Sequence, residues 1–189
     1  KLATGSGKGE LVASFPLCTP DAIWLNLVHR AHLVDDLSER YEARSGQKAG
    51  RIGDGLWSVE RTTFATFASL YPHLGEPAVQ RYLQSVQGVL CDETHTVAAE
   101  TFSAVLSSLP NAYWRIGVSA TPFDRSDKLS ILVVSLLGPM VYELAAGELI
   151  EMGQLADPTI QLLPFRHSPD LCLSPWPEVY DLGIMQNEA

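Results

Sequence analysis

The chain has 189 residues, of which 46% are hydrophobic, and a formal net charge of −9, which suits one globular domain with a sizeable core. The acidic balance excludes a domain that holds nucleic acid through a broad basic surface, so any nucleic-acid contact has to be local. No apolar run approaches the roughly 18 residues of a membrane span, and the first residues lack the apolar core of a signal peptide, which predicts a soluble protein with no membrane partner. The scattered cysteines indicate the reducing cytoplasm.

The chain opens on a glycine-rich loop, TGSGKG, which leads into an apolar helical stretch that begins at Leu11. Glycines allow backbone N–H groups to turn inward and cradle anionic oxygens, and Lys8 is placed to reach the outer phosphates. A flexible linker is the alternative, because no strand precedes the loop, and we interpret the sequence as an internal fragment that lacks its first strand. The pattern predicts a nucleoside triphosphate site formed by Thr4, Gly5, Ser6, Gly7, Lys8 and Gly9.

The next segment predicts a strand followed by an amphipathic helix. Ala22–Val28 is an apolar run of strand length, and His29–Glu42 carries apolar residues at helical spacing, at Leu33, Leu37 and Tyr41. His29 and His32 have a spacing that can hold a metal ion, but no third ligand lies nearby in the sequence. A histidine zinc site is therefore not expected.

Two short strands around a glycine-rich turn are expected next, at Arg51–Leu56 and Ser58–Thr66. The second of these strands ends in threonines at a loop. Two helical segments follow, at Phe67–Tyr71 and Pro77–Ser85, and the second of them leads directly into another apolar run. This order of elements, with strands and helices alternating along the chain, is typical of an α/β domain.

The apolar run Val86–Cys91 ends abruptly in Asp92, Glu93 and, two residues on, His95. Such a run suits a strand that is buried on both faces, as parallel sheets require, and the loop after such a strand is where open α/β sheets bind ligands. Asp92 and Glu93 are therefore expected to face a ligand, although two solvated loop acids would give the same short pattern.

The remaining pattern continues the alternation. A helix with one buried face follows His95, and a strand at Tyr113–Val118 ends in Ser119-Ala120-Thr121-Pro122. A helix is predicted at Asp127–Leu137, a turn with a short strand at Gly138–Leu144, a short helix at Gly147–Met152 and a last strand at Thr159–Pro164. The predicted fold is a three-layer α/β/α sandwich around a mostly parallel sheet.

A nucleotide hydrolase needs a phosphate cradle, a carboxylate for magnesium and a group that activates the attacking water. Lys8, Asp92 and Glu93 suit these roles, with Asp92 holding magnesium largely through water and Glu93 as general base. Side chains on adjoining strand ends are candidates for coupling nucleotide state to conformation, namely His95, Ser119 and Thr121.

TGSGKG, DETH and SATP, in this order, resemble the first, second and third motifs of a superfamily 2 DEAD/DEAH-type helicase. The resemblance implies a P-loop NTPase domain of RecA-like fold at 1–165 that uses ATP and Mg2+, and a linker at 166–189 towards a second RecA-like domain whose arginines complete the ATP site. LVHRAHLVDDLSERY and TFATFASLY resemble motifs that line the nucleic-acid path in that family, which makes Arg30 and Thr66 candidate phosphodiester contacts; a solvated helix start and a loop cap are the simpler alternatives.

Gly9 departs from the family pattern, which has Thr or Ser directly after the phosphate-loop lysine. The hydroxyl that would ligate magnesium is missing, and losing a contact to a charged centre costs on the order of 1.5–3 kcal/mol. Two functions stay open: an ATP-dependent helicase or translocase motor that acts on DNA or RNA, with DETH favouring DNA, and a catalytically impaired, nucleotide-dependent nucleic-acid-binding module. An interaction domain with an incidental glycine loop is a third interpretation.

Overall fold

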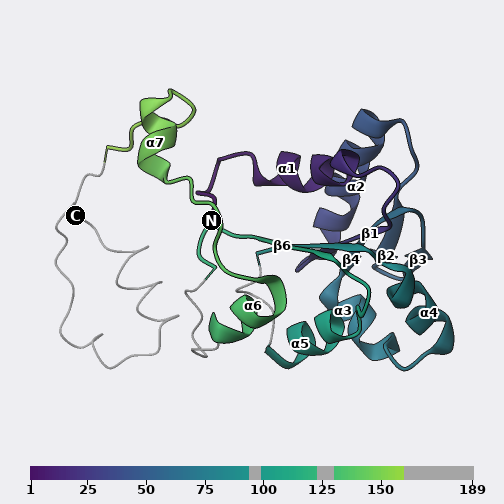
Figure 1. Ribbon diagram of the computed structural model, residues 1–189. Coiled ribbons are helices and arrows are strands. Elements are labelled where there is room, and N and C mark those ends of the chain that lie inside the picture. Colours follow the sequence, from purple (N-terminus) through teal and green to yellow (C-terminus); the bar gives the residue numbers. More distant parts are fainter. Residues whose placement is uncertain (94–98, 123–129, 160–189) are drawn as a thin grey trace, which may run out of the picture. The chain divides into compact units, whose positions relative to one another are not determined.

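The computed structural model describes residues 1–93, 99–122 and 130–159. The chain divides into two units, 1–156 and 157–189, and of the second only residues 157–159 are described. The end of the predicted domain at 165, the linker at 166–189 and most of the predicted strand Thr159–Pro164 therefore lie outside the described residues. The first unit carries all of the elements discussed below (Figure 1).

One six-stranded sheet organises this unit, in the order β3-β2-β4-β1-β5-β6. Only β3 runs antiparallel to its neighbour, and every other pair is parallel. The mostly parallel sheet confirms the predicted fold class. The strands are β1 Trp24–Val28, β2 Gly50–Gly53, β3 Leu56–Ser58, β4 Thr62–Thr66, β5 Gly88–Asp92 and β6 Trp114–Val118.

Helices cover both faces of the sheet (Figure 1). One face carries α1 (Lys8–Ser14) and α2 (Ala31–Ser45), and the opposite face carries α3 (Phe67–Leu70), α4 (Pro77–Ser85), α5 (Ala99–Ser107) and α6 (Ser130–Leu137). The element order also includes two short 3-10 helices, η1 (Phe15–Cys18) and η2 (Tyr71–His73), and a short α7 (Ala146–Glu151). The three predicted layers are therefore confirmed.

Strands β1, β4 and β5 are buried along their whole length, as expected for parallel strands covered by helices on both faces, although they include polar residues such as Asn26 and the threonines of β4. Alternate residues of each strand enter two separate cores: Leu25 and Leu27 of β1 pack under α3 to α6, whereas Trp24 and Val28 pack under α1 and α2. Strand β6 lies at the edge of the sheet and is more exposed, as expected for a strand with one hydrogen-bonded neighbour.

Two predicted elements differ from the structure. Ser58–Thr66 is not one strand, because the hydroxyl of Thr63 donates to the carbonyl of Glu60 (2.9 Å) and accepts from its amide (3.1 Å), which makes a turn between β3 and β4. Gly138–Leu144 contains no regular strand, and only Leu144 forms an isolated parallel bridge, with Leu2.

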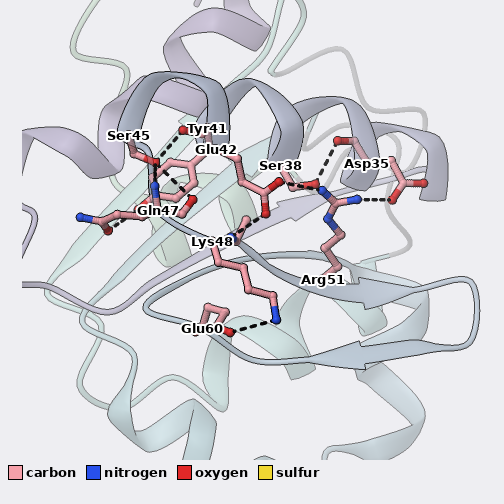
Figure 2. A network of polar contacts seen from close by, with 10 residues as sticks. Asp35, Ser38, Tyr41, Glu42, Ser45, Gln47, Lys48, Arg51 and Glu60 are labelled. Atoms are coloured by element: carbon pink, nitrogen blue, oxygen red, sulfur yellow. Dashed lines mark hydrogen bonds and ion pairs between the residues drawn. The ribbon is translucent and has the colours of Figure 1, made fainter.

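A polar network joins helix α2 to β2 and to the segment that precedes it (Figure 2). The guanidinium of Arg51 on β2 contacts the carboxylates of Asp35 (3.4 Å) and Glu42 (3.2 Å), and Glu42 also accepts a hydrogen bond from the amide of Ala49 (2.9 Å). These contacts hold the helix whose first residues follow β1 at the carboxyl edge of the sheet.

Several expected absences concern the described residues only. Within residues 1–93, 99–122 and 130–159, no helix is long and apolar enough to cross a membrane, and no group of three or more His, Cys, Asp or Glu side chains is arranged to hold a metal ion. Cys18 and Cys91 are free thiols, and burial raises the pKa of Cys91 well above its ordinary value, so this thiol stays protonated at neutral pH.

Asn26 at the centre of β1 is fully buried, and neither its amide nitrogen nor its amide oxygen has a hydrogen-bond partner among the described residues. An unsatisfied buried polar group costs about 1–3 kcal/mol. We therefore expect Asn26→Leu, whose side chain has the same number and branching of heavy atoms, to raise the free energy of unfolding by about 1–2 kcal/mol, measured as a higher urea midpoint at unchanged slope.

Asn26→Asp is the matched control for that substitution. It keeps the shape of the side chain and adds a charge, so we expect a marked loss of stability. If Asn26→Leu instead lowered the free energy of unfolding, the amide would have to be satisfied in the native protein, and the argument from its burial would be wrong.

Candidate active site

The carboxyl ends of four parallel strands meet along one edge of the sheet. The strand register places Val28 of β1 beside Thr66 of β4, and Asp92 of β5 beside Val118 of β6. Because β1 also pairs with β5, the loops that follow these four strands share that edge. The described strand-end residues that are predicted to carry function therefore lie on one side of the domain.

The glycine-rich loop Thr4–Gly9, which the sequence predicts to bind phosphate and which is called the phosphate loop below, is attached to the same edge beside β6 through the residues that precede it. The amide of Leu2 donates to the carbonyl of Ser119 (3.0 Å), and the amide of Ala3 donates to the carbonyl of Leu144 (3.1 Å). The loop then turns back, with the amide of Ser6 donating to the carbonyl of Ala3 (3.2 Å), and enters α1 at Lys8. This path brings the loop to the ends of β5 and β6.

Two glycines give the loop its shape. Gly5 and Gly7 both have φ near +82°, a backbone conformation that strains any residue with a Cβ. A Cβ on Gly5 would also lie only 2.7 Å from Cδ2 of Leu155, so a residue that follows α7 covers one side of the loop. The hydroxyl oxygen of Ser6 is buried and has no hydrogen-bond partner among the described residues.

Lys8 points to the end of β5. Its ammonium lies 3.6 Å from a carboxylate oxygen of Glu93, and it also donates to the carbonyls of Leu2 (3.4 Å) and Ala3 (3.5 Å). The two charged side chains are 13% and 22% exposed, so this ion pair is screened less by solvent than a surface pair. Lys8 and Glu93 thus lie side by side at the carboxyl edge of the sheet.

Glu93 is held from three directions. Its second carboxylate oxygen accepts a hydrogen bond from the hydroxyl of Ser119 (3.1 Å), and its amide donates to the carbonyl of Val118 (2.9 Å). Its backbone has φ of +47°, a left-handed conformation that is unfavourable for a residue with a long side chain. The strained turn aims Glu93 between Lys8 and Ser119.

Asp92 precedes this turn as the last residue of β5 and is 9% exposed. Its register partner Val118 and Leu90, two residues earlier in β5, belong to the core under α1 and α2. Because residues two apart in a strand share a face, Asp92 lies on the face of the sheet that carries α1. Thr121 follows on the β6 side, where its amide donates to the hydroxyl of Ser119 (3.2 Å).

The two candidate nucleic-acid contacts lie further along the same edge. Arg30 is exposed at the N-cap of α2, directly after β1. Thr66 is buried and caps α3, with its hydroxyl accepting from the amide of Ser69 (3.0 Å) and donating to the Ser69 hydroxyl (2.8 Å). The Thr66 hydroxyl is therefore engaged in capping, and its part in nucleic-acid binding stays a prediction. His95 lies outside the described residues.

The sequence reasoning missed two neighbours of the phosphate loop. Leu155, which covers Gly5, comes from the far end of the unit, and Arg40 of α2 lies against Gly9. No local pattern identifies either residue, because both contacts depend on how distant segments pack.

The family model for the Type III restriction enzyme, res subunit, matches residues 1–124, about two thirds of the chain. The chain belongs to this family. No curated protein sequence is similar enough to count as a relative. The matched residues include the phosphate loop, the acidic turn after β5 and the Ser119 segment, so the family match covers the whole contact set around Glu93.

Solved structures share the fold at low sequence identity. A structure of T4 UvsW aligns with a TM-score of 0.56 and 18% sequence identity, and the alignment covers 72% of this chain and 29% of that chain. A structure of the UvsW helicase from Bacteriophage T4 aligns with a TM-score of 0.54 and 16% sequence identity, covering 72% of this chain and 51% of that chain. A hypothetical ATP-dependent RNA helicase from Sulfolobus tokodaii aligns with a TM-score of 0.60 and 17% sequence identity, covering 75% of this chain and 46% of that chain. The chain thus spans about half or less of these solved chains. Its family match and its fold are those of a first RecA-like domain of the superfamily 2 helicase type.

Proposed function

We propose that this domain binds ATP with magnesium and hydrolyses it to drive movement along a nucleic-acid strand. The observation that carries the proposal is the position of Glu93, with Lys8 of the phosphate loop on one side (3.6 Å) and Ser119 on the other (3.1 Å). Membership of a helicase family supports the general class, a nucleic-acid helicase motor domain.

The residues present suit the phosphates of a nucleotide. Gly7 leaves open space where a Cβ would stand, and the buried hydroxyl of Ser6 has no partner among the described residues. Lys8 rests on backbone carbonyls and on Glu93, which a phosphate can replace. Magnesium fits less completely, because Asp92 offers a carboxylate but Gly9 offers no hydroxyl.

Each side chain then has one task. Water attacks the γ-phosphorus of bound ATP, the bond to the bridging oxygen breaks, and ADP leaves with that oxygen. Lys8 moves from Glu93 to the outer phosphates, and the freed Glu93 takes a proton from the attacking water. Asp92 would hold the magnesium ion, largely through water, and the ion would help to neutralise the charge of the phosphates. Ser119 orients Glu93 and, with Thr121 and His95, relays the presence of the outer phosphate to the rest of the domain.

Nucleic acid and a second domain complete the proposed motor. We place the nucleic acid near Arg30 and Thr66, at the ends of β1 and β4, and we favour DNA over RNA. Since the net charge is −9, a second RecA-like domain in the same polypeptide would supply much of the positive charge, together with the arginines that complete the ATP site.

Gly9 motivates a second candidate function, a nucleotide-dependent nucleic-acid-binding module that hydrolyses ATP poorly. A Cβ on Gly9 would meet Leu37 at 3.5 Å and Arg40 at 3.7 Å, both ordinary contacts, so the backbone of α1 accepts a larger residue here. Comparing ATP turnover of the parent and Gly9→Thr separates the two functions, since only an impaired module gains activity from the restored hydroxyl.

Lys8→Ala tests nucleotide binding directly. We expect the intact protein to bind a fluorescent ATP analogue and the variant to bind it at least about tenfold more weakly, because a charged hydrogen-bond partner contributes roughly 1.5–3 kcal/mol. Lys48→Ala removes an exposed lysine that pairs with Glu60 (3.5 Å) and serves as the matched control. No binding by the parent protein, with or without magnesium, would overturn the proposed function.

A further inference from the structure

The guanidinium of Arg40 lies against the residue that follows the phosphate-loop lysine. A Cβ on Gly9 would have Nη1 of Arg40 only 3.7 Å away and Cδ2 of Leu37 at 3.5 Å. The space beside Gly9 on the side of α2 is therefore filled by these two side chains. A second cation thus stands beside the residue that directly follows Lys8.

Two carboxylates hold Arg40 in this place. Its guanidinium contacts Glu10 of α1 (2.5 Å) and Asp36 of its own helix (3.0 Å), and both acids raise the pKa of Arg40, Asp36 more than Glu10. Glu10 follows Gly9 directly, so its negative charge would repel a polyphosphate in the loop. The ion pair with Arg40 neutralises that charge and links α1 to α2.

Arg44, one helical turn further along α2, allows neutralisation of Glu10 to be distinguished from phosphate binding. It also contacts Glu10, but its other partner is the Ser14 hydroxyl at the end of α1, away from the loop. Both arginines can therefore neutralise Glu10, whereas only Arg40 lies beside Gly9. A guanidinium is suited to bind phosphate oxygens through its forked donors.

We propose that Arg40 is a phosphate-binding residue of the nucleotide site, and that its guanidinium supplies beside Gly9 part of the positive charge that a hydroxyl-held metal would otherwise supply. This inference rests on the proposed function. Arg40 is 41% exposed, which leaves the side chain free to exchange Asp36 or Glu10 for a phosphate oxygen. Nucleotide binding should then depend on Arg40 most strongly when magnesium is absent.

The test compares Arg40→Met with Arg44→Met in the intact protein. The affinity for a fluorescent ATP analogue is measured in EDTA and in excess magnesium. We expect Arg40→Met to weaken binding in EDTA about tenfold and less in magnesium, Arg40→Lys to restore part of the affinity, and Arg44→Met to stay within about twofold of the parent. Thermal unfolding of each variant without nucleotide checks that the link between α1 and α2 is intact.

Two results would overturn the inference while leaving the proposed function standing. One is an equal loss in Arg40→Met and Arg44→Met, which would assign the effect to neutralisation of Glu10 alone. The other is unchanged binding in Arg40→Met while Lys8→Ala still weakens it. No nucleotide binding by the parent protein would overturn the proposed function itself, and this inference with it.

Discussion

Glu93→Gln should lower ATP turnover of the intact protein by about 10²- to 10⁴-fold, the range that a general base contributes. Glutamine keeps the size of the side chain and its amide oxygen still accepts from the Ser119 hydroxyl, so the turn after β5 is preserved. It cannot accept a proton from water. Steady-state ATP hydrolysis, measured with and without single-stranded DNA, gives the fold-change.

Nucleotide binding makes this prediction specific. Glu93 now pairs with Lys8 at 3.6 Å, and the neutral amide ends that ion pair. Lys8 is then free for phosphate, so Glu93→Gln should bind the fluorescent ATP analogue as tightly as the parent protein or more tightly. Glu60→Gln, before β4 at the opposite edge of the sheet, removes an exposed carboxylate and should change neither quantity. Unchanged turnover in Glu93→Gln would remove Glu93 from its proposed role.

Most of the fold could be predicted because its signals are local. The apolar run before Asp92 and the apolar residues at helical spacing in α2 and α5 each predict one element, and the structure has those elements. The error at Ser58–Thr66 has a physical cause as well. The side chain of Thr63 makes a turn with Glu60 that no period in the sequence reveals.

The candidate site is less accessible to sequence reasoning. The order of TGSGKG, DETH and SATP indicates which residues belong together, but the contacts of Glu93 with Lys8 and Ser119 depend on the register of β5 and β6 and on the path of the loop. The position of Arg40 beside Gly9 depends on how α1 packs against α2. Such distances arise from tertiary packing, and the roles assigned to these residues stay predictions.

Arg115 on β6 is a further case in which one strand residue has a role that its sequence position does not reveal. Its guanidinium donates to four backbone carbonyls, at Leu109 (2.6 Å), Ala112 (3.1 Å), Leu106 (3.2 Å) and Leu136 (3.4 Å). The carbonyls of Leu106 and Leu136 lie near the ends of α5 and α6, where carbonyls have no partner within the helix, and those of Leu109 and Ala112 lie in the segment between α5 and β6. One half-buried side chain thus joins the ends of two helices to the edge strand.

Arg115→Met should therefore lower the free energy of unfolding by about 2–4 kcal/mol, because it keeps the aliphatic stem but removes four hydrogen bonds to backbone carbonyls in a partly buried position. The free energy of unfolding of Arg115→Lys should lie between those of the parent protein and Arg115→Met, since an ammonium keeps the charge but cannot reach four carbonyls at once. Arg81→Met on α4 removes an exposed arginine and should stay within about 0.5 kcal/mol of the parent. Urea unfolding measures the series, and equal midpoints for Arg115→Met and Arg81→Met would show that these hydrogen bonds exchange with water at no net cost.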